Sequence, residues 1–487
     1  MIINVGAKLK KREELYNLGI NCIRYCISII FIIFVLVAFV IKPVYNFQDY
    51  PEFDWMGIND YIDLILVVIV FFLIFKFRSK LDIILKKEII VIVFFMAAFS
   101  YIFLLPLKPF SDMLQIYEGA ITVHQEGLEY FKSNVYYSVY PNNIMTALFY
   151  SLLYFGPCKS DFLIKISNMF IVLGTAFFSC KILEIYSRRY NNIFFFIIIT
   201  FLSVFMYINH VYNDLLVTFF CSIGLFIYVK NSENIWISTL IFSLMYFFRP
   251  TAMIFCVAMG IDFLLKGEFN KEMAKKGIVS VILMISILVI INNMFISKIV
   301  NEQIKSTPIW SFIYMGFNED EFGFQDGSHS SERTATDVKN RIAEYGAIKT
   351  SKILGKKSYW TWMEGTYQAA RYAFGENTSD WQKKYYYKTI LTPHFMTVDQ
   401  KLPSLLNRVM RSQYYCFFIM LIIGFLKKPT KEFDFYYLSF FGFFLFYLFW
   451  EMKSRYILTL YPIMLIVGFY SLIQILDNKN KIKKVQL

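Results

Sequence analysis

Long apolar runs alternate with short polar loops along most of the chain, and several runs reach the roughly 20 residues that a helix needs to cross a bilayer. The runs predict about twelve transmembrane helices, which fall at about 18–41, 61–77, 88–106, 161–183, 192–209, 214–230, 235–249, 250–266, 277–297, 413–427, 433–450 and 456–475. The apolar run after Asn143 is shorter than a crossing, so we interpret it as interfacial or re-entrant. The predicted fold class is an all-α polytopic membrane protein with additional juxtamembrane helices.

The same pattern divides the chain into successive parts. Residues 1–107 hold a basic N-terminal segment and the first three transmembrane helices, 108–160 an outer loop with juxtamembrane or re-entrant helices, and 161–297 a transmembrane core. Residues 298–412 are polar yet rich in Trp and Tyr, which predicts a mostly helical extracytoplasmic lobe rather than a disordered linker. Residues 413–487 carry the last transmembrane helices and a basic cytoplasmic tail.

The composition excludes a soluble domain and argues against a nucleic-acid partner. Of the 487 residues, 57% are hydrophobic, 20% aromatic and only 17% charged, which is more apolar than a soluble domain. The net charge of +13 would suggest nucleic acid in a soluble protein, but here the basic residues gather in clusters between apolar runs. Placing these clusters in the cytoplasm predicts a multi-pass cell-membrane protein with both termini inside and the loop after 88–106 outside.

The cysteines and the residue usage narrow the cellular setting. The seven cysteines include no CxxC pair, so neither a disulfide framework nor a zinc site is indicated. Heavy use of Phe, Ile, Tyr, Lys and Asn, with little Ala, is typical of an AT-rich bacterial genome. Asn377-Thr378-Ser379 has the spacing of a glycosylation sequon on the predicted outer side, and in a bacterial protein that match carries little weight.

Several ionisable residues fall on the predicted outer face. Asp112 opens the polar stretch that follows the helix at 88–106, a position that suits a catalytic base, and Glu118 lies in the same stretch. Other outer turns carry the remaining candidates for substrate binding, which are His210, Asp214, Arg249, Glu451, Lys453 and Arg455. Ionisable groups at membrane depth are costly and usually face a cavity or a partner, so their gathering predicts an outward-facing polar site.

Each candidate also has a structural interpretation. Asp214 would cap the helix that it begins, because a carboxylate suits a helix N-terminus. Arg249 would extend its charge to the lipid headgroups. Glu451 and Arg455 have the i, i+4 spacing of a helical ion pair. His210 would be an interfacial histidine with satisfied hydrogen bonds, and the loop of Asp112 an ordinary surface loop.

Four short motifs carry a family resemblance. They are an acidic residue in an early outer loop (Asp112), Tyr140-Pro141-Asn142 before the next apolar run, an Asp that begins a later helix (Asp214), and Arg455-Tyr456 followed by Tyr461-Pro462. Over about 80–475 the arrangement resembles the GT-C superfamily of polyprenyl-phosphate-sugar-dependent glycosyltransferases, which includes protein O-mannosyltransferases and aminoarabinose transferases. The chain departs from that pattern in an extra helical hairpin before the acid loop and in a single Asp where some members carry a paired Asp-Glu.

The resemblance implies a membrane glycosyltransferase that moves a sugar from a polyprenyl phosphate to an extracytoplasmic glycan, lipid or protein. Asp112 would take the proton of the acceptor hydroxyl, and Arg249, Lys453 and Arg455 would stabilise the departing phosphate. Direct displacement by the acceptor would invert the anomeric carbon. A monophosphate donor does not require a divalent metal, although Asp112, Glu118, His210 and Asp214 are of the types that hold one.

Two other function classes fit the same pattern. A transporter or flippase of about twelve helices would show matching halves, and the large insert at 298–412 breaks such symmetry. A polysaccharide polymerase or ligase of the Wzy or O-antigen ligase type would use outer-loop arginines such as Arg341 and Arg371 and a lipid diphosphate donor.

Overall fold

Helices make up nearly all of the regular structure, which confirms the predicted all-α class. The computed structural model describes residues 2–45, 50–154, 159–231, 235–266, 271–300, 306–324, 332–375, 378–396, 401–427 and 431–485. The strands within these ranges are β1 (Ile41–Tyr45) and β2 (Pro51–Trp55), which pair antiparallel in one hairpin. Asn377 of the predicted sequon lies outside the described residues.

In the described ranges, seven helices are long and apolar enough to cross a membrane, and one bent pair would make an eighth. The seven lie in α1 (Ile2–Ala38), α2 (Ile58–Lys76), α4 (Lys87–Leu104), α9 (Phe162–Tyr186), α15 (Lys271–Val289) with the segments that follow it, α21 (Lys401–Leu426) and α23 (Tyr461–Val485). The bent pair comprises α10 (Asn191–Ile199), α11 (Leu202–Met206) and η2 (Tyr207–Asn209), with an angle of 50°.

The remaining apolar helices are short. They are α12 (Asp214–Lys230), α13 (Ile235–Tyr246), α14 (Met253–Lys266) and α22 (Asp434–Phe449), each with 17 residues or fewer. A helix therefore stands at each predicted position, but twelve crossings are not confirmed and stay a prediction. The other short helices are α3 (Arg78–Ile84), η1 (Pro141–Asn143), η4 (Pro250–Ala252), the π-helix η5 (Ile290–Ile296), α16 (Ser297–Ile299), η8 (Lys431–Phe433) and η9 (Ser454–Leu460).

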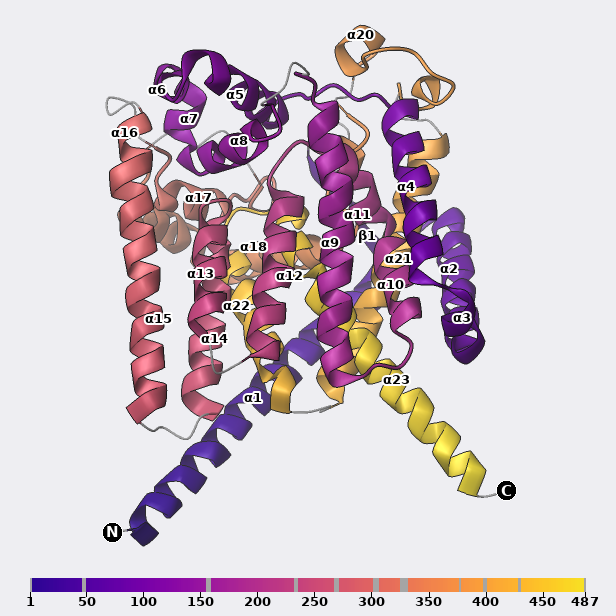
Figure 1. Cartoon of the computed structure of the whole chain (residues 1–487), viewed down its shortest axis with the longest axis vertical. Helices are drawn as coiled ribbons and strands as arrows, with labels where there is room; N and C mark the ends of the chain where they lie inside the picture. Colours follow the sequence, from indigo (N-terminus) through magenta and orange to yellow (C-terminus); the bar gives the residue numbers. More distant parts are fainter. Residues whose placement is uncertain are drawn as a thin grey trace.

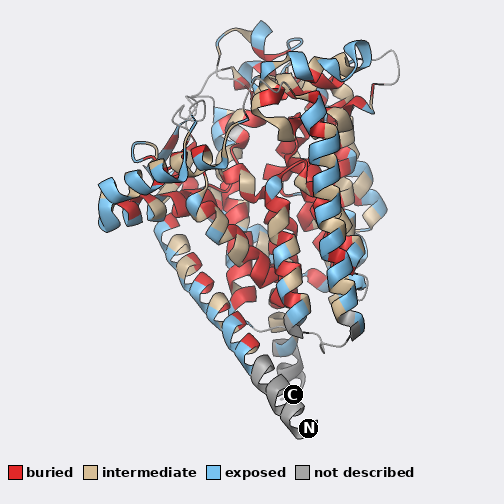
Figure 2. Cartoon of the chain, turned by 90° about the vertical axis from the view of Figure 1, so that its left-hand side faces the viewer, coloured by how far each residue is buried: buried red, intermediate tan, exposed pale blue. Residues whose placement is uncertain are grey.

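The long helices form one bundle with a buried centre. α21 packs against α23, α9 packs against α12, and α12 also packs against α13. Buried residues fill the interior of this bundle, and exposed residues cover its outer faces (Figure 2). Both termini lie at the same end of the bundle (Figure 1), which agrees with the predicted topology, while the side of the membrane on which they lie stays a prediction.

The opposite end of the bundle carries a cap of short helices (Figure 1). They are α5 (Asp112–Glu126), α6 (Glu129–Ser133), α7 (Val135–Val139) and α8 (Ile144–Ser151), and we call them the cap helices. The eight residues of α8 are too few to cross a bilayer, and this helix packs along α5. The run after Asn143 is thus too short for a crossing, and its interfacial or re-entrant placement stays a prediction.

The predicted lobe at 298–412 consists of helices joined by long loops. Its helices are α17 (Ile309–Met315), α18 (Ala335–Met363), α19 (Ala369–Tyr372), α20 (Trp381–Lys384) and η7 (Thr392–Phe395). The lobe attaches to the hairpin, because the Trp360 indole N–H donates to the Val44 carbonyl at 3.2 Å. Helix α21 begins at Lys401 rather than at 413, since Leu402 and Leu406 continue the apolar face that packs on the core.

Candidate active site at the cap end

A cavity of about 1260 Å³ lies at the cap end of the bundle. The N-terminus of α5, the turn before α8, the turn between α13 and η4, and the segment between α22 and α23 all contribute to its wall. The predicted site residues among its lining are Asp112, Arg249, Glu451, Lys453 and Arg455. Segments separated by more than 300 residues in the sequence therefore meet at one site.

The floor of the cavity is an ion-paired cluster of Asp214, Arg249 and Arg455, which we call the floor cluster. The Arg249 guanidinium pairs with one carboxylate oxygen of Asp214 and donates to Asn213 Oδ1 at 3.1 Å. Arg455 Nη1 lies 3.3 Å from the other oxygen. Because two guanidinium groups share one carboxylate, the cluster carries a net charge of +1. Such an excess suits an anion in the cavity.

This arrangement corrects the interpretations of Asp214 and Arg249. Asp214 is fully buried under the two arginines and does not line the cavity, so its position does not support the predicted role in substrate binding. Its carboxylate makes no cap, since Asn213 is the N-cap residue of α12. Arg249 is only 6% exposed, so its charge does not extend to lipid headgroups.

His210 also lies behind the cavity wall rather than in it. Its Nδ1 is 3.6 Å from Asp214 Oδ2, and its ring packs between Tyr207 and Tyr372, with centroid distances of 4.8 and 5.0 Å. Neither ring nitrogen has a hydrogen-bond partner among the described residues. The predicted role of His210 in substrate binding is therefore not supported by its position.

Asp112 faces the cavity from the first position of α5. Ser111 before it has φ 51°, a left-handed conformation that is uncommon for a non-glycine residue and that turns the chain into the helix. Within the described ranges no group donates a hydrogen bond to the Asp112 carboxylate, and the side chain is half-buried. Its carboxylate is thus open to a bound molecule.

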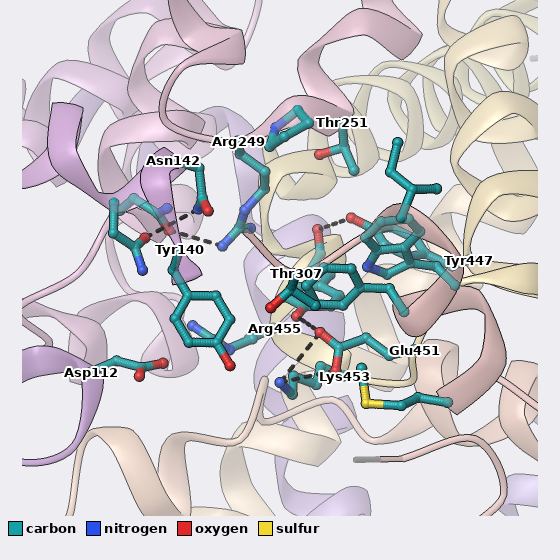
Figure 3. Close-up of a pocket in the computed structure, with 18 of the residues that line it drawn as sticks. Asp112, Tyr140, Asn142, Arg249, Thr251, Thr307, Tyr447, Glu451, Lys453 and Arg455 are labelled. Atoms are coloured by element: carbon teal, nitrogen blue, oxygen red, sulfur yellow. Dashed lines mark hydrogen bonds and ion pairs between the residues drawn. The ribbon is translucent and has the colours of Figure 1, made fainter. Parts of the chain in front are cut away.

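Tyr140 stands between Asp112 and Glu451, two of the acids that line the cavity. Burial, followed by the negative charges of Asp112 and Glu451, raises the pKa of its hydroxyl to about 12. Figure 3 shows Asp112 and Tyr140 on one side of the cavity and Glu451 and Lys453 on the other, with Arg455 between them. The cavity therefore presents carboxylates on opposite sides and cations at its base.

Glu451 forms a second polar group on the far wall. Lys453 Nζ lies 3.2 Å from its Oε2, and the Tyr456 hydroxyl donates to its Oε1. The expected i, i+4 pair of Glu451 with Arg455 does not form, because residues 451–453 precede η9 and are not helical. Arg455 turns instead to Asp214.

Glu118 is not brought to the site. It lies six residues after Asp112, which is about 240° around the helix, and it is exposed on the surface of α5. The proposed metal set of Asp112, Glu118, His210 and Asp214 is therefore dispersed. Among the described residues, no three His, Cys, Asp or Glu side chains lie close enough to hold a metal.

The lobe supplies lining residues that sequence reasoning missed or assigned elsewhere. Arg341 and Arg371, expected only for a polymerase or ligase, line this same cavity, and so do Asp320, Glu321 and Tyr372. Arg341 donates to the Tyr314 carbonyl at 2.8 Å, and Arg371 to the Tyr45 hydroxyl at 3.5 Å. An acidic pair in a polar lobe gives no signal of its own in the sequence.

Comparison with protein-family models, curated proteins and solved structures finds no match to this chain. The geometry of the cavity therefore carries the functional argument.

Proposed function

We propose that the chain is a membrane glycosyltransferase that moves a sugar from a polyprenyl phosphate to an acceptor on the cap side of the membrane. One observation carries the proposal: the floor cluster holds an excess positive charge at the base of a cavity whose wall presents the unpaired carboxylate of Asp112. Phosphate binding and proton removal are the main requirements of transfer from such a donor.

The floor cluster supplies free donors for the phosphate. Arg249 Nη1 and Arg455 Nε are buried and have no hydrogen-bond partner among the described residues. Guanidinium groups bind phosphate oxygens in a bidentate manner. Asp214 fixes both groups before any ligand arrives, so the site is preorganised. The single negative charge of a phosphodiester would neutralise the cluster.

The reaction then needs one displacement. The acceptor oxygen attacks the anomeric carbon, the bond from that carbon to the phosphate oxygen breaks, and its electron pair leaves with the phosphate beside Arg249 and Arg455. Asp112 takes the proton of the acceptor hydroxyl. Since Asp112 and the floor cluster approach the cavity from different elements, acceptor and leaving group can lie on opposite faces of the sugar, which inverts the anomeric carbon.

A lipid diphosphate donor is the second candidate. Arg341 and Arg371 line the same cavity, and a second phosphate would add a negative charge that the floor cluster alone does not balance. Both residues already donate to groups of the protein, at 2.8 and 3.5 Å. The unpaired donors of Arg249 and Arg455 therefore favour the monophosphate.

The test is turnover by the purified protein in detergent, where no sealed compartment exists. Polyprenyl-monophosphate and polyprenyl-diphosphate sugars are incubated separately with a cell-envelope glycan fraction, and the released lipid carrier is measured. We expect protein-dependent release of polyprenyl phosphate from the monophosphate sugar. Release from the diphosphate sugar alone would favour the second candidate. No release from either, together with movement of the lipid-linked sugar across sealed vesicles, would identify a transporter.

A further inference from the structure

A segment of the lobe lies buried against the bundle helices. It comprises residues 364–372, which follow α18 and end with α19, and we call it the inserted segment. Before α19 the segment is wholly buried and not helical. The Ser203 hydroxyl of α11 donates to the Gly365 carbonyl at 3.1 Å, and the Tyr207 hydroxyl of η2 donates to the Tyr367 carbonyl. Because buried carbonyls need hydrogen-bond donors, these bundle hydroxyls stabilise the segment in its place.

The backbone of the inserted segment has an uncommon conformation that a carboxylate fixes. Gly365, Tyr367 and Gln368 have φ values of 76°, 55° and 62°. A positive φ is costly for Tyr and Gln, and residues of this kind cluster at active sites and ligand clamps, where the surrounding structure holds them. The Glu364 carboxylate accepts from the backbone N–H of Thr366 at 3.1 Å and from that of Gln368 at 3.2 Å. Glu364 therefore closes the turn that leads into α19.

The inserted segment contacts the floor cluster at two points. At the first, Glu364 accepts a hydrogen bond from the Ser454 hydroxyl at 2.8 Å, and Ser454 directly precedes Arg455. At the second, the ring centroid of Tyr372 lies 4.8 Å from the guanidinium carbon of Arg455. One contact thus holds the chain beside Arg455, and the other holds its side chain.

The Arg455 guanidinium is held only in part by its counter-charge. Of the two ion pairs with Asp214, that of Arg455 is longer than that of Arg249, with a distance of 3.3 Å. The ring centroids of Tyr212 and Tyr372 lie 4.9 and 4.8 Å from the guanidinium carbon of Arg455, which are cation–π distances. Such contacts are strongest where water is excluded, and Arg455 is buried. A residue of the lobe therefore contributes to the orientation of Arg455.

We infer that the inserted segment holds Arg455 in the orientation that binds the donor phosphate, with Glu364 and Tyr372 as positioning residues. The inference rests on the proposed function and adds how the lobe takes part in it, which is through Arg455. A guanidinium that is held in place before the ligand arrives binds more tightly, because less conformational freedom is lost on binding. Loss of either contact should therefore weaken phosphate binding only while Arg455 is present.

The test is a double-mutant cycle on phosphate binding. Isothermal titration calorimetry of the purified full-length protein in detergent measures its affinity for geranyl phosphate, a short prenyl phosphate without a sugar. We expect Tyr372→Leu to weaken binding about tenfold, the value of a cation–π contact shielded from water. Tyr372→Phe keeps a ring beside the guanidinium and should restore most of the affinity. In protein that already carries Arg455→Ala, Tyr372→Leu should change the affinity by less than about twofold.

Ser454→Ala tests the other contact with little change in side-chain size. It removes the hydroxyl that donates to Glu364, so binding should weaken by roughly threefold. This loss should also disappear in protein that carries Arg455→Ala. Tyr385→Leu is the control, because Tyr385 is a buried tyrosine of the lobe that does not line the cavity. It should bind geranyl phosphate as the wild type does.

The outcomes separate the inference from the proposed function. Wild-type affinity in both Tyr372→Leu and Ser454→Ala would overturn the inference and leave the phosphate site intact. The same would follow if these variants lost as much affinity without Arg455 as with it, or if Tyr385→Leu lost as much as Tyr372→Leu. If the wild type does not bind geranyl phosphate, the proposed function fails, and the inference fails with it.

Discussion

Asp112 and Asp214 begin their helices in the same way, yet their surroundings differ completely. Each is the first residue of its helix, α5 or α12, where the helix dipole favours a negative charge. Asp214 is fully buried and holds Arg249 and Arg455, whereas Asp112 is half-buried and has no hydrogen-bond donor among the described residues. The same local signal thus marks a positioning group in one place and an available base in the other.

The difference in surroundings predicts that Asp214 contributes to the folding stability of the protein and Asp112 to the reaction. A buried carboxylate between two guanidinium groups contributes to folding, because its removal leaves buried charges without a partner. A half-buried carboxylate without partners contributes little to folding and stays free to accept a proton. The predictions below test this separation, from the largest expected effect to the smallest.

Asp214→Asn should destabilise the protein by roughly 3 to 5 kcal/mol, because Arg249 and Arg455 would lose their shared counter-charge inside the fold. Thermal unfolding in detergent measures the effect. Asp112→Asn is the matched control, since Asn suits a helix start as well as Asp does, and it should unfold at the wild-type temperature. Equal unfolding temperatures for the two variants would contradict the comparison.

Arg249→Ala and Arg455→Ala should each weaken binding of a polyprenyl-phosphate sugar by roughly 10 to 100 fold, the value of a charge-assisted hydrogen bond. Lys at either position should restore only part of the affinity, because an ammonium cannot form the bidentate contact. Arg408→Ala is the control. Arg408 Nε lies 2.5 Å from Asp63 Oδ2, and neither residue lines the cavity. Unchanged donor affinity in both floor variants would refute the phosphate site.

Lys357 is a buried lysine whose amine donates to carbonyls instead of pairing with a carboxylate. Its Nζ donates to Gly316 O at 2.5 Å and to Trp450 O at 3.1 Å, and burial lowers the pKa of this ammonium to about 7. The unfolded chain keeps the ordinary pKa of about 10.4. Between these values the unfolded state holds more protons, so stability should rise with pH by up to about 1.4 kcal/mol per unit.

Lys357→Met should remove this rise, which thermal unfolding at pH 7.5 and 8.5 would reveal as a smaller difference than in the wild type. Lys349→Met is the control, because Lys349 is a surface residue paired with Glu319. An unchanged pH dependence in Lys357→Met would show that Lys357 is charged when buried.

Glu118→Gln should change turnover by less than about twofold, because surface substitutions away from a site have small effects. Glu451→Gln gives the contrast, since Glu451 lines the cavity and accepts from Tyr456. Turnover assays of both variants at equal folded protein measure the difference. A larger loss of turnover in Glu118→Gln than in Glu451→Gln would show that Glu118 belongs to the site.

The sequence was sufficient to predict the long apolar helices, and to predict that turns far apart in the sequence lie at one end of the bundle. Apolar runs located the long apolar helices, and the charge of the loops predicted that Asp112, Arg249 and Arg455 share a face, in agreement with their common cavity. The number of membrane crossings could not be predicted from the apolar runs, because α13 and α22, with 12 and 16 residues, are shorter than a bilayer span.

The pairing of the charged residues was beyond sequence reasoning. Asp214 pairs with Arg249, 35 residues away, and with Arg455, 241 residues away, and no periodic pattern connects such positions. The expected pair of Glu451 with Arg455 was wrong because a helix had been assumed where the chain is extended. The position of Glu118 depended on which face of α5 meets the cavity, and that face is set by packing against α8.

The central claim is that Asp112 is the general base of sugar transfer from a lipid phosphate. Glycosyl transfer by purified wild type and Asp112→Asn, compared at equal folded protein, tests it most directly. Asn keeps the size and the helix start but cannot accept the proton, so turnover should fall by about 100 fold or more while donor affinity stays the same. Asp112→Glu should retain little activity, because the added methylene displaces the carboxylate. Comparable rates for wild type and Asp112→Asn would contradict the account.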